Sequence, residues 1–152
     1  MYAEGIHQNE IGGDACSMPV EDGFATKAIL TCSLEHFEED ADTRLFHELY
    51  RVLKPGGMVC VVPFYFHTTA FILTDPTISA VNTVTFDDGI HILCREGWGN
   101  RHGRHYSPET LCSRIVEQVR EKFHFDFYHI SNSRDIDPSS YATFAFTATR
   151  ID

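Results

Sequence analysis

The chain has 152 residues, which is the length of one domain and enough to bury a core. An apolar fraction of 43% is ordinary for a folded protein, and a formal net charge of −10 disfavours nucleic acid and anionic membranes as partners. The longest apolar stretch, residues 58–66, is too short to cross a bilayer, and the first residues lack the apolar segment of a signal peptide. The five cysteines are odd in number and scattered, so we expect reduced thiols in a cytoplasmic protein.

Two short apolar runs enclose a helical segment in the first half of the chain. The run that begins at Ala28 and ends at Cys32 has no polar alternation, which predicts a strand covered on both faces. Residues 58–62 form the second run. Pro55-Gly56-Gly57 precedes it and is expected to end the helix, because proline cannot continue a helix and glycine can turn left-handed. This strand-helix-strand pattern therefore predicts two parallel strands joined by a right-handed crossover.

The intervening helix is predicted from apolar residues that recur at helical spacing, namely Phe46, Leu49, Tyr50 and Leu53. Asp42 or Thr43 can cap its start. The acidic run at residues 38–42 suits the positive end of the helix dipole, and we expect it to be a solvated helix start.

The last third of the chain predicts a helix and two strands. Ser107 is a strong helix cap with Pro108 at the first helical position, and Thr110 follows. Leu111, Ile115, Val116 and Val119 supply the buried face of this helix. Residues 123–128 and 141–149 show the side-chain alternation of strands, and a polar turn around Pro138 separates them. We expect these two strands to form an antiparallel pair.

Several short motifs, taken in order, resemble the class I S-adenosylmethionine-dependent methyltransferases of the small-molecule type. The motifs are Gly13-Asp14-Ala15, Met18-Pro19, Leu34-Glu35-His36, Arg51-Val52-Leu53-Lys54-Pro55-Gly56-Gly57 and Tyr106-Ser107-Pro108-Glu109-Thr110-Leu111. The resemblance extends from about Gly12 to the end of the chain.

The resemblance implies an α/β, Rossmann-like methyltransferase fold. The family's strands lie in the order 3-2-1-4-5-7-6, and this chain is expected to begin at strand three. We therefore expect a single partial domain over residues 1–152 that lacks the first two strands. Its sheet would be mixed, with the order 4-5-7-6 and helices on both faces.

The resemblance also implies a cofactor, S-adenosylmethionine, and residues that contact it. Asp14 would accept a hydrogen bond from the adenine amino group, and Ala15, Ser33 and Leu34 would line the same site. The alternative for Asp14 is a turn after Gly12-Gly13. The family's glycine-rich loop and its ribose-binding acid have no counterpart upstream of Gly13, so we expect this chain alone to bind the cofactor weakly or not at all.

The implied activity is methyl transfer to a small-molecule acceptor that the sequence does not identify. Alignment of the reacting atoms supplies much of the acceleration in such a displacement, so the family needs no fixed nucleophile on the protein. His36 is the candidate catalytic residue, because it would face the crevice and could position an acceptor or take a proton. The alternative is a loop histidine bonded to backbone, and Glu35 beside it is expected to be structural. Phe64, Tyr65 and Phe66 either select the acceptor or pack in the core.

Loss of strand one would leave the strand at Ala28 as an exposed apolar edge. Two remedies are open: a strand stub at residues 10–13 pairs there, or two copies join edge to edge. We expect a homodimer through this edge. The competing functional hypothesis is accordingly a non-catalytic dimeric or regulatory module.

A third hypothesis is a metal-binding module. His91 and Cys94, and then His102 and His105, have the spacing of paired zinc ligands. Such histidine-rich loops also occur in the resembled family without metal, and we assign no metal ligands. The single tryptophan, Trp98, is expected to anchor this loop.

Overall fold

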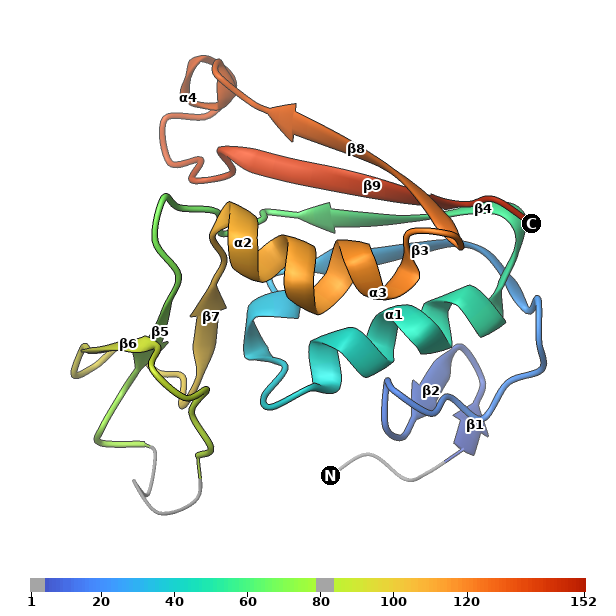
Figure 1. The fold of residues 1–152 in the computed structure, drawn as a ribbon, viewed down its shortest axis with the longest axis horizontal. Coiled ribbons are helices and arrows are strands. Elements are labelled where there is room, and N and C mark those ends of the chain that lie inside the picture. The colour runs from blue at the N-terminus through green and yellow to red at the C-terminus, as the bar shows by residue number, and fades with distance from the viewer. Residues whose placement is uncertain (1–4, 79–83) are drawn as a thin grey trace.

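The computed structural model describes residues 5–78 and 84–152. Its main sheet has four strands in the order β3-β4-β9-β8 (Figure 1). These strands are β3 (Ala25–Thr31), β4 (Leu53–Val62), β9 (Phe144–Arg150) and β8 (Phe123–His129). β3 and β4 pair in parallel, with Ile29 opposite Cys60, while β9 is antiparallel to both β4 and β8. The expected parallel unit and the expected antiparallel pair are therefore both confirmed.

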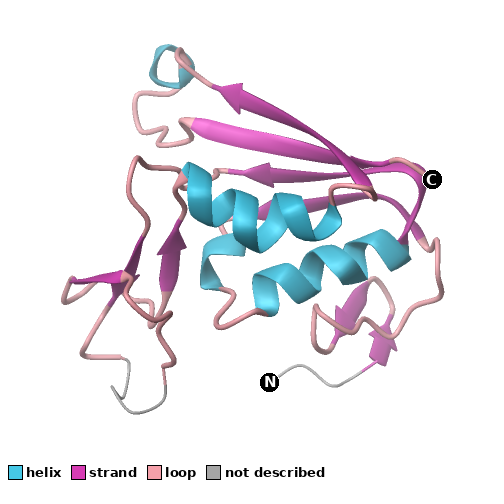
Figure 2. Cartoon of the chain, in the orientation of Figure 1, coloured by secondary structure: helices cyan, strands magenta, loops and turns pink. Residues whose placement is uncertain are grey.

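Two helical segments lie on one face of this sheet (Figures 1 and 2). The first is α1 (Ala41–Val52). The second is continuous and comprises α2 (Pro108–Leu111), the π-helical stretch η2 (Cys112–Val116) and α3 (Glu117–Val119). The core between helices and sheet contains Phe46, Leu49, Val59, Val61, Ile115 and Phe146.

The long helical segments cover one face of the sheet, while the four-residue α4 (Ser133–Ile136) lies beside the ends of β3 and β4, where Ser133 and Ile136 line a pocket together with Thr31 and Val62. Ala28 and Leu30 pack against the core, but Ile29 between them is 68% exposed. The prediction that β3 is covered on both faces is therefore wrong. An unbroken apolar run does not distinguish a buried strand from one whose outer side chain faces solvent.

The start of α1 differs from that predicted. Its N-cap is Asp40, not Asp42 or Thr43, and the helix ends at Val52, before the proline. Pro55-Gly56-Gly57 lies inside β4, where the register with β3 shifts. Glycine is required at residue 57, since an added Cβ would lie 2.7 Å from the carbonyl oxygen of Lys54. The motif therefore forms a bulge in the strand, and the helix has ended ahead of it at Val52, as expected of a helix stop.

The predicted start of the second helix is confirmed. Ser107 is the N-cap, Pro108 follows it in the first turn, and Thr110 completes a reciprocal capping box with Ser107. The buried face includes Leu111, Ile115 and Val119, as expected from their spacing.

Two smaller sheets complete the fold. β5 (Phe71–Thr74) lies between β6 (His91–Cys94) and β7 (Gly103–His105). Near the N-terminus, β1 (Gly5–His7) and β2 (Glu10–Gly12) form an antiparallel hairpin, so β2 does not pair with β3 as one remedy required. β3 is thus an edge strand in the part of the chain that the structure describes. Two short helical turns are η1 (Leu34–His36) and α4 (Ser133–Ile136). None of the helices in residues 5–78 and 84–152 combines the length and apolar character needed to span a membrane.

Candidate active site

A cavity of about 350 Å³ lies where β3 and β4 end. Its wall comprises Cys32, Glu35, His36, Tyr65, Leu73, Arg95, Trp98, Asn100, His105 and Tyr141. The carboxyl ends of parallel strands are where open α/β sheets place their ligands. The wall combines aromatic rings with groups that donate or accept protons. This cavity, here called the crevice, is therefore the candidate active site.

His36 lies in the crevice wall, on the η1 turn that directly follows β3. Its Nδ1 is 2.6 Å from the carbonyl oxygen of His102, so this nitrogen carries the hydrogen and donates it. Its Nε2 lies 3.6 Å from a carboxylate oxygen of Glu35, and the side chain is 36% exposed. The ring thus faces the crevice and is also hydrogen-bonded to backbone. The two alternatives drawn from the sequence, a crevice-facing histidine and a backbone-bonded loop histidine, therefore both describe His36.

Part of the crevice wall is shielded from solvent, at Glu35 and at the aromatic residues Tyr65 and Trp98. Glu35 is buried, and this burial raises the pKa of its carboxyl group. Burial likewise raises the pKa of Tyr65 to about 12, which keeps its hydroxyl protonated. Trp98 packs directly on the backbone of β7, where a Cβ on Gly103 would lie 2.4 Å from the indole ring. The expected anchoring role of Trp98 is thereby confirmed.

A pair of histidines connects the crevice to its surroundings. Nδ1 of His105, in the crevice wall, lies 3.0 Å from Nε2 of His67. The His105 ring stacks on Phe71 at 4.2 Å between centroids, because β5 and β7 place these residues opposite each other. Burial, and to a smaller extent the nearby His67, lowers the pKa of His105 to about 4. The pair was not predicted, because its members lie on different elements.

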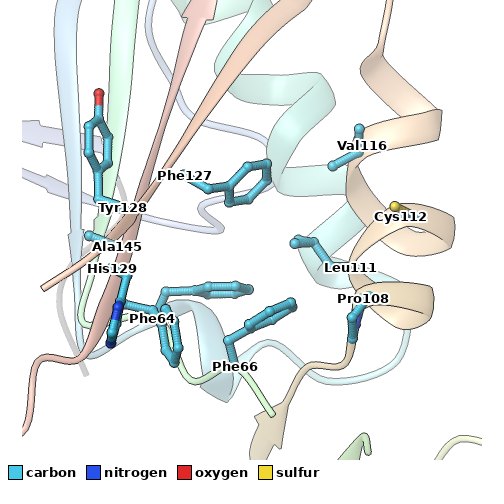
Figure 3. Close-up of a pocket in the computed structure, with 11 residues that line it drawn as sticks. Phe64, Phe66, Pro108, Leu111, Cys112, Val116, Phe127, Tyr128, His129 and Ala145 are labelled. Carbon is cyan, nitrogen blue, oxygen red and sulfur yellow. The ribbon is translucent and has the colours of Figure 1, made fainter. Parts of the chain in front are cut away.

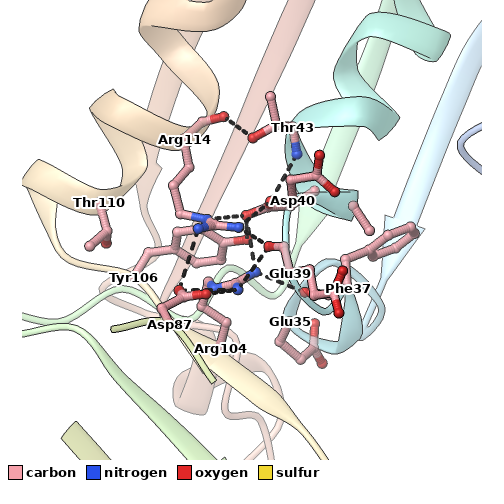
Figure 4. A network of polar contacts seen from close by, with 12 residues as sticks. Glu35, Phe37, Glu39, Asp40, Thr43, Asp87, Arg104, Tyr106, Thr110 and Arg114 are labelled. Carbon is pink, nitrogen blue, oxygen red and sulfur yellow. Dashed lines mark hydrogen bonds and ion pairs between the residues drawn. The ribbon is translucent and has the colours of Figure 1, made fainter. Parts of the chain in front are cut away.

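A buried polar network holds β7, α1 and the second helix together (Figure 4). Asp42, fully buried, accepts hydrogen bonds from Arg114 Nε at 2.8 Å, Arg104 at 3.2 Å and the Tyr106 hydroxyl at 2.8 Å. Asp87 accepts a second bond from Arg104 at 3.0 Å. Burial alone would raise the pKa of Asp42, but the bond from Arg114 and the two positive charges lower it on balance. The expectation of a solvated helix start is therefore wrong at Asp42.

An apolar pocket of about 340 Å³ lies between the second helix and the β8–β9 pair (Figure 3). Phe64 and Phe66 line this pocket, whereas Tyr65 lines the crevice. The remaining wall comes from the second helix and the β8–β9 pair, through Pro108, Leu111, Cys112, Val116, Phe127, Tyr128, His129, Phe144 and Ala145. Alternation along one extended segment thus separates an apolar surface from a polar one.

The four residues expected to contact the cofactor do not line the crevice wall. Asp14 is exposed and forms the turn of the alternative hypothesis, since its Oδ1 accepts the Cys16 N–H at 2.9 Å. Ala15 is exposed on the same turn, and Ser33 is half-buried just before η1. The Leu34 side chain lies in the hydrophobic core. An exposed carboxylate suits an adenine amino donor, so Asp14 fits the cofactor chemically, while Leu34 could meet it only through backbone.

The paired metal-ligand spacing does not produce a cluster in the structure. Nδ1 of His102 lies 3.2 Å from the carbonyl oxygen of Glu35, His105 bonds to His67, and His91 and Cys94 lie on the exposed strand β6. Across residues 5–78 and 84–152, no three His, Cys, Asp or Glu side chains come together as a metal site requires. The five cysteines are all free thiols, as expected.

Comparison with known proteins adds sequence and fold evidence. Residues 3–61 match the family model described as a methyltransferase domain. No curated protein sequence matches the chain significantly.

Solved structures resemble almost the whole chain. A SAM-dependent methyltransferase from Methanosarcina mazei aligns with a TM-score of 0.53 and 16% identity, covering 98% of this chain and 73% of that one. An S-adenosylmethionine-dependent methyltransferase from Mesorhizobium loti gives 0.54 and 15%, covering 91% and 68%. The 1,6-didemethyltoxoflavin-N1-methyltransferase of Burkholderia thailandensis, with bound 1,6-didemethyltoxoflavin and S-adenosylhomocysteine, gives 0.55 and 13%, covering 91% and 48%. These identities establish likeness of fold. Together with the family model they support the resemblance seen in the motifs: residues 3–61 are similar in sequence to a methyltransferase domain, and the chain has the Rossmann-like α/β fold of S-adenosylmethionine-dependent methyltransferases.

Proposed function

We propose that this chain serves in the transfer of a methyl group from S-adenosylmethionine to a small-molecule acceptor held in the crevice. The observation that carries the proposal is the cavity of about 350 Å³ at the carboxyl ends of β3 and β4. Its volume falls within the range of small-molecule sites. The net charge of −10 supports a small molecule over nucleic acid as the partner.

The cofactor, when bound, supplies a methyl group on a positively charged sulfur. Asp14, Ala15 and Ser33, with the backbone at Leu34, are the residues proposed to hold its adenine end. His36 is proposed to contact the acceptor through Nε2, because its Nδ1–H is already donated to a backbone carbonyl. We propose weak cofactor binding by the isolated chain, since the Leu34 side chain is packed in the core and Asp14, Ala15 and Ser33 do not line the crevice.

The test measures cofactor binding and methyl transfer separately. Titration calorimetry with S-adenosylhomocysteine is expected to show weak binding that falls about tenfold in Asp14→Ala, the loss expected for one hydrogen bond to a charged group. Asp135→Ala is the matched control, because Asp135 is also an exposed aspartate but lies on α4. Incubation with S-adenosylmethionine and a panel of hydroxylated and amine small molecules should release S-adenosylhomocysteine, detected by mass spectrometry. No binding at millimolar cofactor, with no release, would refute the proposal.

A second candidate function is a non-catalytic dimer, and the edge position of β3 favours it. An unpaired strand edge is a template for pairing with another chain, and Ile29 adds an exposed apolar side chain. We propose a homodimer through this edge. Sedimentation should show a dimer at micromolar concentration that Ile29→Lys weakens and Ile136→Lys, an exposed site on α4, does not. A monomer at all concentrations would exclude the dimer and leave methyl transfer untouched.

A further inference from the structure

The bonded histidines at the crevice form a path from its interior to solvent. His105 lines the crevice, and its Nδ1 lies 3.0 Å from Nε2 of His67, whose side chain is exposed. His67 continues the extended segment after β4, where its N–H donates to the Tyr106 carbonyl at 2.8 Å. Each end of the path is thus held by backbone pairing.

The hydrogen bond determines which nitrogens are left for other partners. A neutral imidazole has one N–H donor and one lone-pair acceptor. If His105 donates from Nδ1, its Nε2 keeps the lone pair, and His67 accepts at Nε2 while its own Nδ1–H remains. Stacking on Phe71 at 4.2 Å, together with Tyr65 at 5.0 Å, restrains the His105 ring in this orientation.

We propose that His105 accepts the proton of a hydroxyl acceptor in the crevice, and that His67 passes that proton to solvent. This inference rests on the proposed function and specifies its acceptor class. The bound cofactor would supply the methyl group to the acceptor oxygen and would keep the electron pair of the broken carbon–sulfur bond. The oxygen loses its proton to Nε2 of His105. The Nδ1 proton of His105 then moves to Nε2 of His67, which releases its Nδ1 proton to water.

Burial of His105 supports a hydroxyl over an amine as the acceptor. With a pKa of about 4, His105 is uncharged at neutral pH and is a weak base. A hydroxyl oxygen that has gained a methyl group holds its proton very weakly, so a weak base suffices. A methylated amine keeps its proton far more strongly, as the side chain of lysine does with a pKa of about 10.4. A relay that begins at such a weak base therefore suits a hydroxyl acceptor better than an amine acceptor.

The test reads the histidine nitrogens directly and needs no cofactor. Nitrogen-15 NMR of the full chain at pH 7 is expected to show His105 with its hydrogen on Nδ1. In His67→Ala this preference should be lost. His124→Ala is the matched control, since His124 is an exposed histidine on β8 outside the crevice. His105 with its hydrogen on Nε2 in the unmodified protein would overturn the proposal.

Phenol and anisole supply the second arm, because they differ by the hydroxyl hydrogen. Phenol should shift the His105 Nε2 signal toward its hydrogen-bonded position, and anisole should not. Phenol should also bind about fivefold more tightly than anisole, as expected for one hydrogen bond. Equal shifts with the two probes would refute the relay. Neither arm depends on methyl transfer, so failure of cofactor binding and failure of the relay are separate results.

Other ionisable groups in the crevice wall are measured in the same spectra or by substitution. They are Cys32, Glu35, His36, Tyr65, Arg95 and Tyr141. His36→Ala should leave the tautomer of His105 unchanged, because the bond that selects it comes from His67. A change of His105 tautomer in His36→Ala would contradict the assignment of the pair.

Discussion

Replacing Asp42 by asparagine should destabilise the fold strongly, because the change leaves buried positive charge without its counter-ion. Arg104 is fully buried and donates to Asp42 at 3.2 Å, while Arg114 donates to it through Nε and through a terminal nitrogen, both at 2.8 Å. An asparagine amide would point an N–H at one set of these donors. Removing one member of such a buried pair costs about 3–5 kcal/mol. The free energy of unfolding of a whole domain is about 5–15 kcal/mol, so the variant should be only marginally stable.

Urea denaturation followed by far-ultraviolet circular dichroism and Trp98 fluorescence measures this loss. Asp40→Asn is the matched control, with the same chemical change at the start of the same helix. Asp40 pairs with Arg44 at the surface, where such a pair contributes about 0.3–0.5 kcal/mol. A loss below about 1 kcal/mol for Asp42→Asn would show that water or a neutral arrangement satisfies the arginines, and the reasoning would be wrong.

Three further outcomes test other parts of the structure. Gly103→Ala should destabilise by about 1–3 kcal/mol and change Trp98 emission, because the new methyl group displaces the indole; unchanged emission would contradict this packing. Ser107→Ala removes the cap that bonds to Thr110 and should cost about 0.5–2 kcal/mol in the same denaturation assay. The pKa of Asp42 is lower in the folded state than the value of about 3.9 expected when unfolded. The stability that the Asp42 carboxylate contributes is therefore fully present above its unfolded pKa, and it is lost as the pH falls through its folded pKa. When the free energy of unfolding is measured as the pH is lowered, Asp42→Asn should show a smaller acid-induced decrease than the unmodified protein.

Local signals in the sequence predicted the elements that depend on short-range physics. Phe46 and Leu49 at helical spacing identified α1, and Ser107 before Pro108 identified the start of the second helix. The parallel unit followed from two apolar runs around a helix. In each case the determining contacts lie within a few residues of one another, or follow from the handedness of the chain.

The buried network escaped prediction because its partners lie far apart in the chain. Asp42 belongs to an acidic run that has the composition of a solvated helix start, and its neighbours Glu39 and Asp40 are indeed exposed. What distinguishes Asp42 is Arg104, 62 residues later, and Arg114, 72 residues later. Arg104 lies in the segment that we interpreted by its histidines, and Arg114 lies on the second helix, so neither is marked in the sequence as a partner of Asp42. Charge pairing over such separations requires the fold itself.

The histidines show the same limit. Spacing along the chain grouped His102 with His105, whereas the structure gives them different partners: His102, just before β7, contacts the Glu35 carbonyl, and His105, at the end of β7, contacts His67. The second contact follows from the backbone pairing beside it, because the His67 N–H donates to the carbonyl of Tyr106, the residue after His105. Strand register therefore decides which titratable side chains can exchange a proton.

Alternation also explains how one short segment after β4 serves two surfaces. Phe64 and Phe66 turn into the apolar pocket, while Tyr65 turns into the crevice and His67 bonds to His105. The phenylalanines hold the segment, since Phe64 packs edge-on against Phe146 at 4.9 Å between ring centroids. Rigid anchoring on the apolar side is what keeps the polar side chains in place for chemistry. Because successive side chains of an extended segment point to opposite sides, placing Phe64 in the core directs Tyr65 to the crevice.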